Sequence, residues 1–149
     1  MKNFQVNIGS ITPFSMDDYP GHTSMVISFL GCIWDYACIP ESQLIDKEVK
    51  SRVLQKNSFQ NNHKYNWNDA VKLLIQNNHK VDSVVFSGGE PTLQPDLIKA
   101  MKFCKELGFL VGLHSSAIAP DKFKQCLKYV DWVGLYVKAP LANETQDVD

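Results

Sequence analysis

The hydrophobic positions gather into four short apolar segments separated by longer amphipathic stretches. The segment at 84–86 is too short and too continuously apolar for a strand with one solvated face, so it predicts a buried parallel strand covered on both sides. Strands are also predicted at residues 24–30, 109–113 and 132–137. Turn-forming residues recur between positions 6 and 24, which predicts short extended pieces and turns there.

Three amphipathic stretches predict helices between these strands. The first is capped by Asn66 and ends at Asn77, the second runs from Pro95 to Leu107, and the third starts at its cap Asp121. Apolar spacing also allows a short helix over 46–54. The residues predicted to face inward are Trp67, Ala70, Val71, Leu74 and Ile75, then Leu97, Met101, Cys104 and Leu107, then Phe123, Cys126, Leu127 and Val130.

Four strands with a helical crossover between each successive pair predict an α/β fold with a parallel sheet and right-handed crossovers. This order fits a partial (β/α) barrel as well as an open sheet. With 149 residues, the chain is predicted to form a single domain over 1–149 that is large enough to bury its own core.

Charge and hydropathy weigh against two classes of partner. The chain has 15 Lys and Arg against 16 Asp and Glu, a net charge of -1, which gives no electrostatic reason to bind nucleic acid or an anionic membrane. No apolar run approaches the ~20 residues of a membrane span, and the start lacks the apolar core of a signal peptide. The expected location is therefore cytoplasmic, where the four cysteines are metal ligands, nucleophiles or core residues rather than disulfides.

The central strand ends in the turn Ser87-Gly88-Gly89-Glu90. Two glycines at the carboxyl end of a parallel strand permit positive φ and a close approach to the backbone, and α/β folds bind ligands at that end. A carboxylate at this position disfavours phosphate and favours a ligand with a cationic group, such as an amine. The alternative is an ordinary strand-to-helix turn with a solvated glutamate.

The cysteines fall into two classes. Cys104 and Cys126 lie on the inward faces of predicted helices, so they are expected to be small buried hydrophobic residues. Cys32 and Cys38 follow a strand directly and lie in a loop, where packing does not require cysteine. Their spacing matches no zinc finger or ribbon, and a nucleophile paired with His114 is a further alternative.

Several blocks of sequence occur together in one known family. They are residues 10–22, the strand into Gly31-Cys32, the block from Phe86 to Thr92, and residues 111–114 and 131–135. In this order the chain resembles the radical S-adenosylmethionine (radical SAM) activases. It is most similar to the branch that activates anaerobic ribonucleoside-triphosphate reductase.

The resemblance implies a partial (β/α) barrel that holds a 4Fe-4S cluster and S-adenosylmethionine, with Cys32 and Cys38 as cluster ligands. It also implies reductive cleavage to a 5'-deoxyadenosyl radical, which generates a glycyl radical on a partner such as anaerobic ribonucleotide reductase. Electrons would come from a flavodoxin-like donor. The implied cofactor contacts are Ser87, Gly88, Gly89, Glu90, Ser115 and Lys138.

The sequence departs from the family pattern in three places. In the cysteine motif, Tyr36 occupies the second cysteine position and Cys38 comes one residue early. Tyr136 replaces an aspartate. The chain ends at Asp149, where the family barrel would add two strands, so an open edge strand and self-association through it are expected. The alternative is a degenerate or fragmentary domain, a non-catalytic binding module without a competent cluster.

Overall fold

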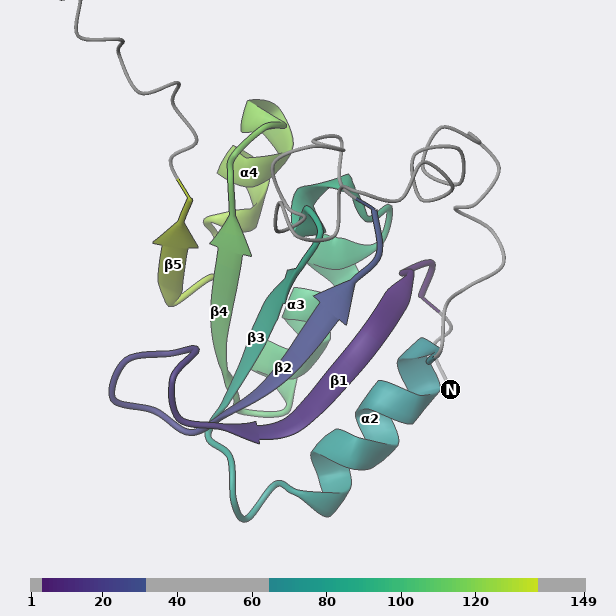
Figure 1. The fold of residues 1–149 in the computed structure, drawn as a ribbon, viewed down its shortest axis with the longest axis vertical. Coiled ribbons are helices and arrows are strands. Elements are labelled where there is room, and N and C mark those ends of the chain that lie inside the picture. The colour runs from purple at the N-terminus through teal and green to yellow at the C-terminus, as the bar shows by residue number, and fades with distance from the viewer. Residues whose placement is uncertain (1–3, 32–64, 137–149) are drawn as a thin grey trace, which may run out of the picture.

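The computed structural model describes residues 4–31 and 65–136, which form a five-stranded sheet with helices (Figure 1). The strand order is β1-β2-β3-β4-β5, with β2 to β5 parallel to one another. The elements are β1 (Ile8–Ser15), β2 (Ser24–Phe29), α2 (Trp67–Gln76), β3 (Ser83–Gly88), the 3-10 helix η2 (Pro91–Leu93), α3 (Leu97–Glu106), β4 (Leu110–Ser115), α4 (Pro120–Cys126) and β5 (Trp132–Leu135).

The predicted parallel strands are all present. Within residues 6–24 the predicted turns lie at 16–22, but the expectation of short pieces was wrong for residues 8–15. These residues form one strand, β1, which pairs antiparallel with β2, so the sheet is mixed. Gly9 and Pro13 suggested turns, yet β1 is an edge strand, and there an unpaired proline nitrogen costs no ladder bond. The β1–β2 register shifts around each of these two residues, between Ile8 and Ser10 and between Thr12 and Ser15.

The two faces of the sheet are covered differently. The larger core packs one face against α2, α3 and α4, with Val84 and Phe86 fully buried there. On the opposite face Val85 is buried beneath Tyr19 and Trp132, which stack with ring centroids 5.4 Å apart. The central strand is therefore covered on both sides, as predicted. In the described residues β1 and β5 are the sheet edges, and closure into a barrel remains a proposal.

The helix predictions hold in outline and fail at the ends. Asn66 caps α2 through a reciprocal capping box with Asp69, as its position suggested. Leu107 and Leu127, predicted to face inward, are each 47% exposed because α3 and α4 end one residue before them. Ile75, predicted to face inward as well, is 58% exposed at the end of α2. Asp121 is not the cap of α4, which follows Ala119 and begins at Pro120. The helix expected over 46–54 lies outside the described residues.

Within the described part of the chain, no helix is both long and apolar enough to cross a membrane. Cys104 and Cys126 are buried and unpaired, as predicted. Burial raises the pKa of the Cys104 thiol to about 12, which suits a packing role rather than a reactive one.

Candidate functional site

The site forms where the carboxyl ends of the parallel strands meet. The Gly-Gly-Glu loop (Gly88 to Glu90) leaves β3 and lies against the last residues of β2. The Gly89 amide donates to the Phe29 carbonyl oxygen at 2.9 Å, and the Glu90 amide donates to that of Gly31 at 2.8 Å. These two bonds continue the β2–β3 pairing beyond both strands, up to the residue before Cys32.

Glycine is required at both positions of this loop. Gly88 has φ +98, and a Cβ there would lie 2.4 Å from the Phe29 nitrogen. A Cβ on Gly89 would lie 2.0 Å from the Gly31 carbonyl oxygen. The predicted close approach to the glycine pair is therefore confirmed, and the group that approaches is the β2 backbone.

The Glu90 carboxylate is buried and hydrogen bonded throughout. Only 2% of the residue is exposed. Its Oε1 accepts from the Thr92 amide at 3.1 Å, the Thr92 hydroxyl at 2.6 Å and the Ser115 hydroxyl at 2.7 Å. Its Oε2 accepts from the Ser116 amide at 2.9 Å and the Ser116 hydroxyl at 2.8 Å. Glu90 thereby ties the exit of β3 to the exit of β4, and the solvated glutamate of the alternative reading is ruled out.

Glu90 is ionised in this setting. Burial opposes ionisation and would raise its pKa, but the hydrogen bonds from Thr92, Ser115 and Ser116 outweigh burial and hold the pKa below the usual value. No salt bridge of the described residues involves Glu90. The carboxylate is therefore a buried negative charge held by neutral donors, and it creates a negative potential at this end of the sheet.

The structure brings together some of the predicted site residues. Ser87, Gly88 and Gly89 lie at the end of β3, and Ser115 at the end of β4 bonds Glu90 directly. Cys32, Cys38 and Lys138 lie outside the described residues. Among the residues that are described, no three His, Cys, Asp or Glu side chains converge as a metal site.

Three site residues escaped the sequence analysis. Thr92 and Ser116 supply four of the five hydrogen bonds to Glu90, and Gln94 lies 3% exposed just after η2. The order Glu-Pro-Thr was a usable signal for Thr92, because an acidic residue before proline is a good cap for a helical turn, and Glu90 does cap η2. Ser116 and Gln94 carry no such local signal.

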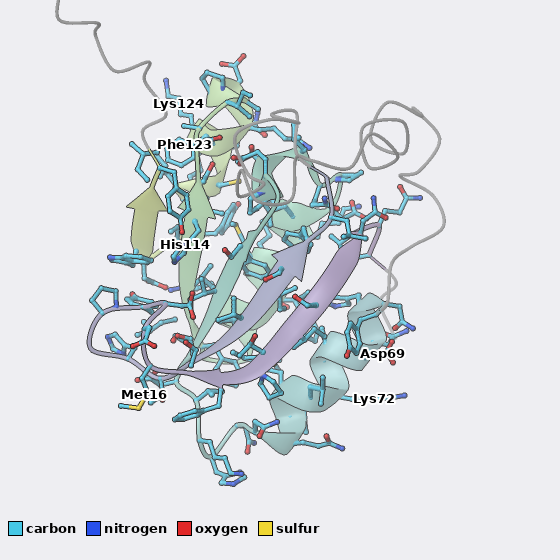
Figure 2. All side chains as sticks on the ribbon, in the orientation of Figure 1. Met16, Asp69, Lys72, His114, Phe123 and Lys124 are labelled. Carbon is cyan, nitrogen blue, oxygen red and sulfur yellow. The ribbon has the colours of Figure 1, made fainter. Side chains whose placement is uncertain are left out.

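His114 is held between β5 and the β1–β2 connection (Figure 2). Its Nε2 lies 2.9 Å from the Asp18 carbonyl oxygen, which can only accept, so Nε2 carries the proton. In the neutral ring, Nδ1 therefore accepts from the Tyr136 hydroxyl at 2.6 Å. Both ring nitrogens are occupied, which leaves neither free to activate a cysteine in this arrangement.

Comparison with known proteins finds two activating enzymes and one synthase that are similar to this chain. The chain is 29% identical over 140 residues to a protein of Methanocaldococcus jannaschii named as a glycyl-radical enzyme activating enzyme, covering 88% of this chain and 50% of the relative. It is 27% identical over 135 residues to the 7-carboxy-7-deazaguanine synthase of Thermococcus kodakarensis, covering 85% of this chain and 53% of that one. A pyruvate formate-lyase-activating enzyme of Clostridium pasteurianum is 39% identical over 56 residues, which are 37% of this chain and 24% of that one.

Two of these relatives are named as activating enzymes, in line with the resemblance that the sequence motifs suggested. No family model matches the chain, and no solved structure matches it. The chain spans about half the length of the two relatives that it matches along most of its own length.

Proposed function

We propose that the chain is a radical SAM activase domain that generates a glycyl radical on a partner enzyme of the anaerobic ribonucleotide reductase type, with electrons from a flavodoxin-like donor. One observation carries the proposal. The Gly-Gly-Glu loop is hydrogen bonded to the residues that immediately precede Cys32, so the backbone that leads to the proposed cluster ligands adjoins the loop that the resemblance assigns to S-adenosylmethionine.

The described half of the site fits this cofactor. S-adenosylmethionine carries an ammonium and a sulfonium group, and the buried Glu90 charge has no cation paired with it in the described residues. In this proposal Ser87, Gly88, Gly89, Glu90, Ser115 and Lys138 bind S-adenosylmethionine. Cys32 and Cys38 hold the cluster, which when bound supplies the electron that cleaves the sulfonium.

Anaerobic reconstitution with iron and sulfide tests the cluster. Two thiolates in place of three predict substoichiometric or labile loading, which Cys32→Ala or Cys38→Ala should abolish. The matched control is Cys104→Ala, because Cys104 is buried in the helix-side core and should not affect iron content. A stable, full 4Fe-4S complement would refute the degenerate alternative, and no iron in the wild-type protein would refute the cluster.

Calorimetry with S-adenosylmethionine tests the loop. Glu90→Gln removes the buried charge. Because the protein itself supplies all five hydrogen bonds to the carboxylate, the expected effect is the lost attraction between that charge and the ammonium group, a weakening of about 1–2 kcal/mol. Glu106→Gln is the control, because Glu106 is exposed at the end of α3. Equal affinities of wild type and Glu90→Gln, or no binding by either, would refute the role of the loop in binding S-adenosylmethionine and leave it an ordinary strand-to-helix turn.

A further inference from the structure

The Gln94 side chain closes a ring of hydrogen bonds around the exit of β2. Its Nε2 donates to the Leu30 carbonyl oxygen at 2.9 Å, and its Oε1 accepts from the Asn7 amide at 2.7 Å. The Leu30 amide in turn donates to the Asn7 carbonyl oxygen at 2.8 Å. The amide orientation is unambiguous, because a backbone N–H only donates and a backbone carbonyl only accepts.

With the bond from Gln94, all three consecutive carbonyls from Phe29 to Gly31 accept a hydrogen bond. Gly89 and Glu90 bind the oxygens of Phe29 and Gly31 from the β3 side. Successive carbonyls of an extended chain point to opposite sides, so the Leu30 oxygen faces the other way, toward β1. The Gln94 side chain supplies the donor on that side. A single segment, residues 89–94, therefore binds every carbonyl from Phe29 to Gly31.

We propose that Gln94 is a positioning residue, which fixes Leu30 and Gly31, the residues just before Cys32 in the sequence, against the Gly-Gly-Glu loop. It needs an amide because the ring requires one donor and one acceptor on the same planar group. Glutamate would place an oxygen against the Leu30 carbonyl, and methionine would leave the partly buried Asn7 amide and Leu30 carbonyl without these partners. The role rests on the proposed function, in which the Gly-Gly-Glu loop binds S-adenosylmethionine and the cysteines that follow Gly31 in the sequence hold the cluster.

Amide hydrogen exchange on the full chain without metal tests the ring itself. Gln94→Met should lower the protection of the Asn7 amide about tenfold, because that amide loses its acceptor. Gln94→Glu keeps an acceptor for Asn7 but sets an oxygen against the Leu30 carbonyl, so it should lower the protection less, and the Leu30 amide, which donates to the Asn7 carbonyl, should follow as the ring loosens. Gln125→Met and Gln125→Glu are the matched controls, because Gln125 is exposed on α4 and should leave both amides unchanged. Unchanged protection in the Gln94 variants would overturn the proposal without reference to any cofactor.

Binding of S-adenosylmethionine to the reconstituted protein separates positioning from mere stability. Gln94→Met should bind about tenfold more weakly than wild type and lose the spectroscopic change that S-adenosylmethionine causes in the cluster. Asp131→Asn is the stability control, because it weakens hydrogen bonds near the start of β5 and leaves the ring intact. Wild-type affinity in Gln94→Met, with protection lost, would show a purely structural role and overturn the proposal. If the wild-type protein binds no S-adenosylmethionine, the proposed function and the positioning role both fail, and the exchange difference alone survives.

Discussion

Replacement of Glu90 by glutamine is the sharpest test of how the site is held together. The Glu90 carboxylate accepts five hydrogen bonds and is 2% exposed. In Glu90→Gln an NH2 group replaces one oxygen, and if it faces Ser116 the amide of that residue loses its acceptor. One unsatisfied buried donor, together with weaker bonds to a neutral oxygen, should lower the free energy of unfolding by about 2–4 kcal/mol.

Urea denaturation at neutral pH measures this loss, with Glu106→Gln as the exposed control that should change stability by less than about 0.5 kcal/mol. Thr92→Val, a near-isosteric change that removes one hydroxyl donor, should cost about 1–2 kcal/mol, whereas Thr92→Ser keeps the hydroxyl and should recover most of it. Wild-type stability in Glu90→Gln would refute the argument that these five bonds hold the ends of β3 and β4 together.

The same substitution should change the acid sensitivity of the protein. The hydrogen bonds lower the folded pKa of Glu90 below its ordinary value of 4.5, so its stabilisation is fully present above that pH and is lost as the pH falls through the folded pKa. The difference in unfolding free energy between wild type and Glu90→Gln should therefore shrink as the pH is lowered below about 4.5. A difference that stays constant down to pH 2 would mean that the charge of Glu90 contributes nothing.

Two further substitutions test the frame around the site. Gly89→Ala places a methyl group 2.0 Å from the Gly31 oxygen and should lower the free energy of unfolding by about 3 kcal/mol, the upper end of overpacking. Gly21→Ala is the control: its methyl group meets no atom within 4 Å, and it should cost about 1 kcal/mol for the positive φ. Equal melting temperatures for the two variants would contradict the close approach. Asp131→Asn weakens contacts to the Lys105 ammonium at 2.7 Å and the Val111 amide at 2.8 Å, and should cost about 1–2 kcal/mol by denaturant titration, less at high salt. If the loss of stability does not depend on salt, it comes from the hydrogen bond to the Val111 amide alone and not from the ion pair with Lys105.

The sequence by itself determined the elements whose signal is local. Continuous apolar runs placed β2 to β5, and the Gly88–Gly89 pair predicted a turn that another group approaches closely. The apolar spacing of α3 and α4 placed Cys104 and Cys126 in the core, and Asn66 was identified as a cap from its position alone. Each of these features depends on a few neighbouring residues and on burial, so a single sequence contains enough information to predict it.

Only the tertiary structure decided how the segments meet. β1 became a strand because the edge position tolerates Pro13 and offers β2 as a partner, which no local pattern reveals. Glu90 was recognised as unusual, but its five donors come from η2 and from the end of β4, 25 or 26 residues further on in the case of Ser115 and Ser116. Gln94 meets Asn7 and Leu30 across separations of 87 and 64 residues. A buried polar side chain is satisfied by whichever groups the fold brings to it, and for that reason its partners cannot be predicted from its neighbours in the chain.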